Sequence, residues 1–254
     1  MGRIITFINE KGGIGKTSCC FNIAWELAKD SKVLLIDMDG QRANLTYFCG
    51  YKMQDADFTM HHVLLENKSI HAAVKPVKNG LDLIPANYML STLPPSAKIS
   101  TFKKALQSIS DKYDYVLIDV NPTPNWTHSL ALSCSDHIII PMLPDITSLE
   151  ANLGICESIA EVKDTTNPNL KVLGMVFNKY AGRINLAKQV TEIANSIASR
   201  LETTVFQTTI RNAVSLSENV YFHTGITDYD PKSAVADDIR NLIIEMKERL
   251  NNGC

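Results

Sequence analysis

A glycine-rich segment near the start of the chain constrains the fold more than any other feature. It reads Lys11-Gly-Gly-Ile-Gly-Lys-Thr17 and lies between the apolar run Ile4-Ile8 and a helical pattern over 17–29. A strand, a glycine-rich turn and a helix in this order form the context that a phosphate-binding loop requires. Glycines let backbone N–H groups turn toward an anion, and a helix N-terminus adds about half a positive charge. The segment therefore predicts an α/β fold with a phosphate site after the first strand.

The residue types in this loop favour a nucleoside triphosphate over a dinucleotide. The strict pattern G-x-x-x-x-G-K-[ST] fails because Glu10 stands in place of its first glycine. A dinucleotide fingerprint is the alternative, since Asp37 follows about twenty residues later, where a ribose-binding acid would stand. That fingerprint, G-x-G-x-x-G, is not met either, because Lys16, Thr17 and Ser18 put polar groups where it packs on glycine. We expect Lys16 to meet the β- and γ-phosphates and Thr17 to offer its hydroxyl to Mg²⁺.

Short apolar runs alternate with longer helical patterns along the rest of the chain. The expected strands are Ile4-Ile8, Val33-Ile36, Leu81-Ile84, Tyr115-Ile118, His137-Ile140 and Val172-Phe177. The expected helices cover 17–29, 98–111, 147–162, 185–200 and 232–250, with a weaker one at 58–66 in an otherwise irregular stretch, 49–80. This alternation is typical of a doubly wound, mostly parallel sheet with helices on both faces. No linker divides the chain, so we expect one domain over 1–254.

Carboxylates stand at the ends of two expected strands, where ligands bind in such folds. Asp37 and Asp39 follow Val33-Ile36, and Asp119 follows Tyr115-Ile118. Because carboxylates repel a triphosphate unless a cation intervenes, they imply Mg²⁺ or positioned water. For Asp37, a helix cap or loop anchor is the alternative.

Lys11 adds a second cation to a loop that already holds Lys16. A second charge in the same pocket would gain little, so Lys11 needs another target. A solvated surface lysine is the alternative.

Six segments, taken in order, resemble the ParA/MinD family of ATPases, and most closely its Soj-like ParA members. They are Lys11-Thr17, Val33-Leu-Leu-Ile-Asp-Met-Asp39, Tyr113-Asp-Tyr-Val-Leu-Ile-Asp119, Ile138-Ile-Ile-Pro141, Leu216-Ser-Glu218 and Tyr229-Asp-Pro-Lys-Ser233. The resemblance covers nearly the whole chain. It implies a P-loop NTPase fold with a deviant Walker loop, and ATP and Mg²⁺ as cofactors.

The resemblance also implies roles for single residues. Asp119 would hold Mg²⁺ through a water, Asp39 would orient the attacking water and Asp37 would support the metal shell. Lys11 would cross to the phosphates of a second subunit, so that ATP drives homodimerisation, and would act with Lys16 and Asp39 in catalysis. The nucleotide would be bound by Lys11, Gly12, Gly13, Ile14, Gly15, Lys16, Thr17 and Ser18, with adenine near Asn178, Ile210 and Pro231. A strand-end asparagine such as Asn178 is as often a turn residue.

Two departures from the family pattern affect function. Gly40 stands where relatives carry proline, and we expect it to loosen the loop after Asp39 and so to affect hydrolysis. Two arginines expected for contact with DNA appear as Ser215 and Ala234. The remaining basic candidates, each of which is otherwise a solvated charge, are Arg211, Lys232, Arg240, Lys247, Arg249, Lys103 and Lys104.

Composition limits the partners. A formal net charge of -2 and a pI of about 6.3 exclude a uniformly basic surface, so any DNA contact must be a local patch. The six cysteines form no C-x-x-C pair and the N-terminus resembles no signal peptide, so we expect reduced thiols in the cytoplasm. Acidic residues in 232–250 favour a helix docked on the core over a membrane anchor. We expect His61 and His62 to be surface residues and not metal ligands.

By kinship, the resemblance implies ATP dimers that bind DNA non-specifically in plasmid or chromosome partition, with a ParB-like partner that accelerates hydrolysis and no membrane contact. A MinD-like positioning ATPase that acts on a membrane or a protein complex is the alternative. A kinase or reductase built on the same loop is disfavoured.

Overall fold

The computed structural model describes residues 2–92, 94, 98–146, 149, 152–181 and 187–253. A seven-stranded sheet runs through this part of the chain in the order β3-β4-β2-β5-β1-β6-β7. The strands are β1 Arg3–Phe7, β2 Val33–Met38, β3 Lys75–Lys78, β4 Leu81–Ile84, β5 Tyr115–Val120, β6 His137–Met142 and β7 Lys171–Phe177. Neighbouring strands pair in parallel, except that β3 pairs antiparallel with β4 at one edge. The predicted doubly wound, mostly parallel sheet is confirmed.

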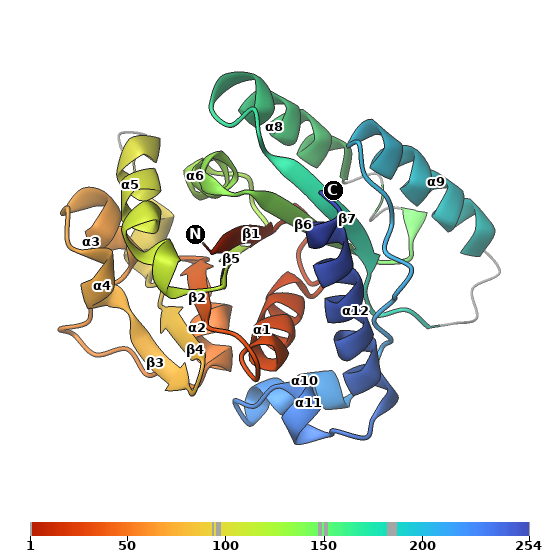
Figure 1. The fold of residues 1–254 in the computed structure, drawn as a ribbon, viewed down its shortest axis with the longest axis horizontal. Helices are drawn as coiled ribbons and strands as arrows, with labels where there is room; N and C mark the ends of the chain where they lie inside the picture. Colours follow the sequence, from red (N-terminus) through yellow and green to blue (C-terminus); the bar gives the residue numbers. More distant parts are fainter. Residues whose placement is uncertain are drawn as a thin grey trace.

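Helices cover both faces of this sheet (Figure 1). They are α1 Lys16–Leu27, α2 Asn44–Phe48, α3 Met60–Leu65, α4 Ile70–Ala73, α5 Ile99–Ile109, α6 Trp126–Cys134, α8 Asn152–Thr165, α9 Ala187–Arg200, α10 Ser215–Tyr221, α11 Ile226–Tyr229 and α12 Ala234–Asn251, with the 3-10 turns η1 Tyr88–Thr92 and η2 Ser110–Lys112. The first residues of two expected helices, 147–148, 150–151 and 185–186, lie outside the described residues.

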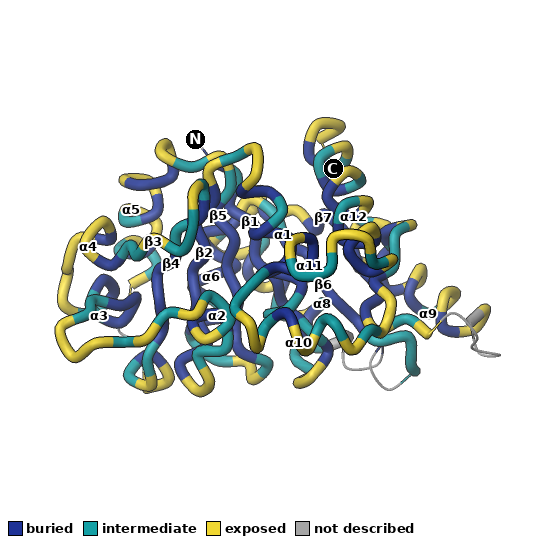
Figure 2. The backbone as a smooth tube through the Cα atoms, turned by 90° about the horizontal axis from the view of Figure 1, so that it is seen from below, coloured by how far each residue is buried: buried dark blue, intermediate teal, exposed yellow. Residues whose placement is uncertain are grey.

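The two faces separate by the alternation of side chains along each strand. In β1, Ile4 packs into one apolar cluster with α3, α5, α6, α8 and α9, whereas Ile5 and Phe7 pack into another with α1 and α12. Successive side chains of a strand point to opposite faces, so one buried strand supplies both cores. Figure 2 shows the strands as the buried centre of the molecule.

The C-terminal helix is docked on the core, as predicted. In α12, Ile239, Leu242 and Met246 are buried in the same cluster as α1. Burying one such side chain contributes about 1.5–3 kcal/mol, which favours this packing over exposure of the apolar face. Among the described residues, no helix combines the length and hydropathy that a membrane span needs.

Two expectations about this architecture were wrong or incomplete. The stretch 49–80 is not irregular around the predicted helix, because it also holds α4 and the edge strand β3. Helix α6 was not predicted, although Asn125 caps it by accepting hydrogen bonds from the backbone N–H groups of Thr127 and His128. Cys19, Cys20, Cys49, Cys134 and Cys156 are free thiols.

Candidate functional site

The glycine-rich loop connects β1 to α1 at the centre of the sheet. Gly13 and Gly15 have φ angles of 76° and 88°, in the left-handed region that favours glycine, and Gly15 forms the N-cap of α1. Asn9 fixes the start of the loop, because its Nδ2 donates to Pro141 O at 2.7 Å and its Oδ1 accepts from Lys11 N at 2.9 Å. The loop therefore presents the N-terminus of α1 to any anion bound there.

A pocket of about 280 Å³ opens over this loop. It is lined by Gly12, Gly13, Gly15, Lys16, Thr17, Ser18, Asp39, Arg42, Asn44, Phe48, Val120, Pro122, Asn178, Lys179, Asn212, Ala213, Leu216 and Ser217. The lining combines the glycine-rich loop, Lys16 and Asp39 with amides and with apolar side chains such as Phe48 and Leu216. This composition suits a ligand that has an anionic part and a less polar part.

Thr17 and Asp119 meet beside the loop. The Thr17 hydroxyl donates to Asp119 Oδ2 at 2.7 Å, and Asp119 Oδ1 is buried with no hydrogen-bond partner in the described structure. Burial, and next the charge of Asp37, raise the pKa of Asp119 to about 8. A buried carboxylate oxygen left unpaired beside a threonine hydroxyl is a donor set that Mg²⁺ prefers, so these residues fit that ion.

Lys16 lies at the start of α1 with 6% of its surface exposed. Burial lowers the pKa of this lysine, whereas the charges of Asp119 and Asp39 raise it. A cation this buried stays charged most easily beside anions, and a bound triphosphate would supply them.

Asp37 anchors the loop that follows β2. Its Oδ1 accepts from Asp39 N at 2.9 Å, and its Oδ2 accepts from Thr46 N at 2.8 Å and from the Thr46 hydroxyl at 2.7 Å. Burial raises the pKa of Asp37 to about 6 despite these bonds. Because both carboxylate oxygens serve the loop, the geometry matches the alternative of a loop anchor, and a place in the metal shell stays a prediction.

Asp39 lines the pocket and shapes the same loop. Its Oδ1 accepts from Gln41 N at 3.0 Å and from Arg42 N at 3.2 Å. The carboxylate therefore holds its own loop at the edge of the ligand space.

Gly40 packs closely against another segment, and its expected effect on loop flexibility and hydrolysis stays a prediction. The residue is buried, and a Cβ placed on it would lie 2.4 Å from Ser91 N and 2.8 Å from Leu90 C. Glycine is needed here because η1 packs directly against the backbone. The departure from proline therefore reflects a close contact with η1.

Lys11 points away from the pocket that its own loop forms. Its Nζ lies 3.2 Å from Asp145 Oδ1, after β6, and within the described chain Lys11 is not among the residues that line the pocket. The two lysines of the loop therefore have different surroundings, and a target of Lys11 in a second subunit stays a prediction.

The three residues expected near adenine differ in their relation to the pocket, and their contact with adenine stays a prediction. Asn178 is buried at the pocket, where its Nδ2 donates to Ile14 O at 2.7 Å. Ile210 is buried and pairs through its backbone with Phe177 and Tyr180, and Pro231 is exposed; neither lines the pocket. The structure places Asn212, Ala213, Leu216 and Ser217 there instead. The nearby Leu216-Ser-Glu218 match was the sequence signal for this wall.

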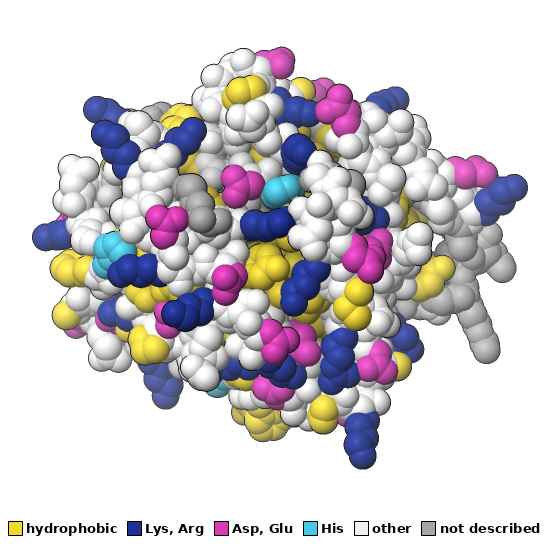
Figure 3. Space-filling model, viewed as in Figure 1, with side chains coloured by type: hydrophobic (Ala, Val, Ile, Leu, Met, Phe, Trp, Pro, Cys, Tyr) yellow, Lys and Arg dark blue, Asp and Glu magenta, His cyan; other side chains and the backbone are white. Residues whose placement is uncertain are grey.

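All three arginines considered for DNA contact already have acidic or carbonyl partners. Arg211 binds Asp238 with two nitrogens at 2.7 and 2.8 Å, and Arg240 binds Asp237 and Pro231 O. Arg249 binds Glu245 and backbone carbonyls of β7 and the segment 204–205. Figure 3 shows basic and acidic side chains interspersed on the face in view. Lys232, Lys103 and Lys104 are exposed.

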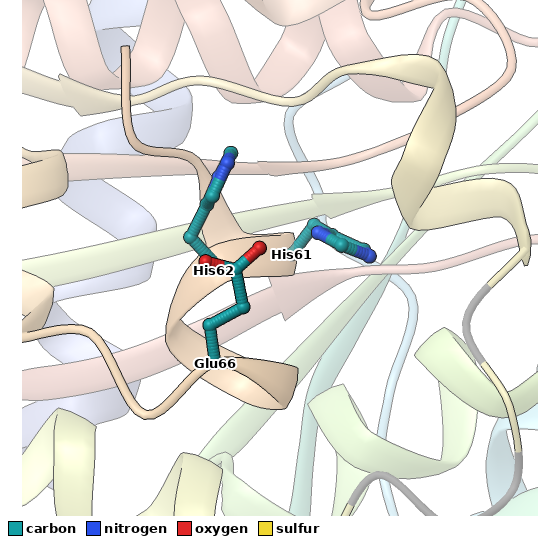
Figure 4. Close-up of side chains that lie close together, drawn as sticks. All are labelled: His61, His62 and Glu66. Atoms are coloured by element: carbon teal, nitrogen blue, oxygen red, sulfur yellow. The ribbon is translucent and has the colours of Figure 1, made fainter. Parts of the chain in front are cut away.

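His61, His62 and Glu66 cluster around α3 (Figure 4), with one possible ligand atom from each lying within 4.8 Å of the others. His61 is buried, with 8% of its surface exposed, so the expectation of a surface residue was wrong. His62 Nδ1 accepts from Thr59 N at 3.1 Å and closes a capping box at the start of α3. That these histidines bind no metal stays a prediction.

The sheet topology, the loop and the Thr17–Asp119 pair together define a P-loop NTPase of the deviant Walker type. A family model described as an AAA domain matches residues 2–172. Soj, the sporulation initiation inhibitor protein of Bacillus subtilis, is 30% identical over 253 residues that cover 97% of this chain and 98% of Soj. The chromosome-partitioning ATPase Soj of Thermus thermophilus is 32% identical over 251 residues, covering 98% and 96%.

Solved structures agree in fold. Apo McdA from Cyanothece superposes with a TM-score of 0.86 at 18% identity, covering 98% of this chain and 100% of McdA. A putative plasmid partition protein of Borrelia burgdorferi bound to AMPPNP gives 0.78 at 28% identity, with 100% of each chain covered. The chain therefore belongs to the ParA/MinD-type ATPases and is similar to the Soj and ParA proteins of partition systems.

Proposed function

We propose that this protein is an ATPase of the ParA type, which ATP converts from monomer to homodimer and which acts in plasmid or chromosome partition. The observation that carries the proposal is the separation of the two loop lysines. Lys16 lines the pocket. Lys11 is not among the pocket-lining residues of the described chain, and its Nζ lies 3.2 Å from Asp145 Oδ1.

The pocket residues divide the work of nucleotide binding. The backbone N–H groups of Gly12 to Thr17 and the Lys16 ammonium hold the phosphates. Thr17 and Asp119 would hold Mg²⁺, whose charge neutralises the phosphate oxygens when it is bound. Asp39 lines the same pocket and would orient the attacking water once its loop yields the carboxylate.

Lys11 would give the dimer its dependence on the γ-phosphate. An exposed ion pair such as Lys11–Asp145 contributes about 1 kcal/mol or less, whereas a charge-assisted hydrogen bond to a desolvated phosphate contributes about 1.5–3 kcal/mol. Two-fold symmetry makes two such contacts at once. Exchange of Asp145 for the phosphate of a second subunit is therefore favourable only when ATP is present.

DNA and a ParB-like partner are further parts of the proposal. Exposed lysines such as Lys232 would supply the contact, since Arg211, Arg240 and Arg249 bind acidic or carbonyl groups. If a dimer neutralised about four phosphates, DNA affinity would fall roughly hundredfold between about 50 and 200 mM salt. The partner would accelerate a hydrolysis that is slow in the isolated protein.

Light scattering of the purified protein with ADP, and with a non-hydrolysable ATP analogue, tests the proposal. We expect a monomer with ADP and a dimer with the analogue, and Lys16→Ala should remain monomeric in both. A wild-type protein that stays monomeric with the analogue would contradict the dimerising ATPase.

A MinD-like positioning role is separated by co-sedimentation with DNA and with anionic liposomes, both in the presence of ATP. Salt-sensitive binding to DNA supports partition, and binding to liposomes supports the alternative.

A further inference from the structure

Asn121 directly follows β5 and carries a buried amide that has no partner. The residue is 1% exposed, and in the part of the chain that the structure describes neither its Nδ2 nor its Oδ1 has a hydrogen-bond partner. Its neighbours Val120 and Pro122 both line the pocket. An amide left unpaired in this way costs free energy, so it points to a bound molecule that supplies the missing hydrogen bonds.

Helix α6 fixes the backbone of Asn121. The buried His128 ring donates from Nε2 to Asn121 O, since a carbonyl oxygen can only accept. Burial lowers the pKa of His128, and the charges that act on this ring include those of Lys16 and Asp39. The turn after β5 therefore lies within electrostatic range of the phosphate loop and of the loop after β2.

The register of the sheet brings Asn121 level with Asp39. The pairing of β2 with β5 ends with Met38 beside Val120, so Asp39 and Asn121 come next on the two chains. Side chains two residues apart on an extended chain share one face, and Asn121 stands two residues after Asp119. The proline that follows Asn121 favours this extended backbone. The Asn121 amide thus belongs to the same face as the two carboxylates of the site.

An attacking water needs more than one acceptor to fix its orientation, because it has two hydrogens. In the proposed function Asp39 accepts a hydrogen bond from one of them. A second acceptor would hold the other, so that a lone pair of the water faces the γ-phosphorus. An amide oxygen suits this place because it accepts without adding negative charge beside a triphosphate, and side-chain amides orient the attacking water in other NTPases.

We propose that Asn121 is a catalytic residue, whose Oδ1 accepts a hydrogen bond from the water that attacks the γ-phosphate. The water oxygen bonds to the γ-phosphorus while the bond to the β–γ bridging oxygen breaks, which leaves ADP and inorganic phosphate. The amide takes up no proton, since one water hydrogen stays on the phosphate and the other passes to solvent. The proposal rests on the ATPase function above and deepens it.

Asn121→Leu tests this role, because leucine keeps the branched shape and removes both polar atoms. We expect single-turnover phosphate release to fall at least about tenfold, since a misplaced nucleophile can cost about 10²-fold. ATP affinity by calorimetry should stay within about threefold of wild type. The midpoint of urea denaturation should be at or above that of wild type, because an apolar group replaces an unpaired buried amide. Asn121→Ala should show the same loss of rate.

Asn167→Leu is the matched control for an amide with a structural role. Asn167 Nδ2 donates to Leu132 O and Ser135 O at 3.0 and 2.7 Å, before the start of β6 and therefore at the edge of the sheet away from the phosphate loop. This variant should denature at a lower urea concentration and release phosphate at the wild-type rate.

The outcomes separate this inference from the proposed function. Wild-type phosphate release by Asn121→Leu would overturn the role of Asn121 and leave the ATPase standing. A loss of rate in Asn121→Leu but not in Asn121→Ala would also overturn it, since the larger side chain would then block the site. So would a lower urea midpoint together with an equal loss of ATP affinity, which marks a structural amide. A wild-type protein that releases no phosphate from ATP would refute both proposals.

Discussion

Lys11 Nζ and Asp145 Oδ1 lie 3.2 Å apart within one chain, and their side chains are 30% and 43% exposed. This pair joins the phosphate loop to the segment that follows β6. Water screens a pair so exposed, so its contribution is about 1 kcal/mol or less. A stronger anion could therefore displace Asp145 from Lys11, as the proposed dimer contact requires.

Removing the Asp145 charge should favour the dimer. In Asp145→Asn the ion pair between Lys11 and residue 145 is weakened, so we expect dimerisation with the ATP analogue at up to about fivefold lower protein concentration. Sedimentation velocity over a concentration series measures this. Weaker dimerisation of the variant would show that Asp145 takes part in the interface instead.

Lys11→Ala should separate binding from assembly. We expect ATP affinity within about threefold of wild type, because Lys16 holds the nucleotide of its own chain. We also expect the variant to stay monomeric with ADP and with ATP. Calorimetry and light scattering on one sample check both parts. A variant that still dimerises with ATP would rule out the cross-subunit role.

Asp39 variants should assemble and then stall. Asp39→Ala and Asp39→Asn both lose the carboxylate that would orient water, and the amide of the second keeps an acceptor for Gln41 N and Arg42 N. We expect phosphate release to fall by about 10²-fold or more in both variants, with the dimer unchanged. Undiminished phosphate release would show that another residue orients the attacking water.

Gly40→Ala should destabilise the fold, because its Cβ would lie 2.4 Å from Ser91 N. Overpacking a buried site costs about 1–3 kcal/mol, which urea denaturation would measure. Gly12→Ala is the matched control for stability, since its Cβ would come no nearer than 3.9 Å to Pro122 Cγ. Equal stability of the two variants would show that η1 moves aside at little cost.

Arg211→Ala should affect stability more than DNA binding. It leaves the Asp238 carboxylate, 7% exposed, without its guanidinium partner, and we expect a loss of about 1–2 kcal/mol on denaturation. DNA co-sedimentation with ATP should stay the same, whereas Lys232→Ala should weaken it. If Arg211→Ala weakened DNA binding and Lys232→Ala did not, Arg211 would be a DNA contact.

All the described strands except β3 were predictable, because each is a short apolar run with β-branched residues. The phosphate loop was predictable because a strand, a glycine-rich turn with lysine, and a helix follow one another in the sequence. Helix α6 was missed since its residues from Leu130 to Cys134 are all buried, so no polar face marks a helical period. Strand β3 was missed because Lys75 and Lys78 make an edge strand look like a loop.

The rest of the site depended on contacts between distant segments. Nothing local to Gly40 indicates that η1 will lie on it, and the sequence does not show that Lys179 reaches Gly13 across the sheet. Asp37 illustrates the same limit, because its anchoring partner Thr46 lies nine residues away in the short helix α2.

The Thr46 hydroxyl gives its hydrogen to Asp37 Oδ2 and receives one from Ala86 N at 3.1 Å. One oxygen atom thus fastens α2 to the exits of two adjacent strands, and Ala86 stands two residues before η1 begins. A rearrangement after Asp39 that shifts α2 would therefore also displace the segment between β4 and η1, because Ala86 is bonded to Thr46 and η1 packs on Gly40. This segment is thus coupled to the loop whose Asp39 lines the pocket.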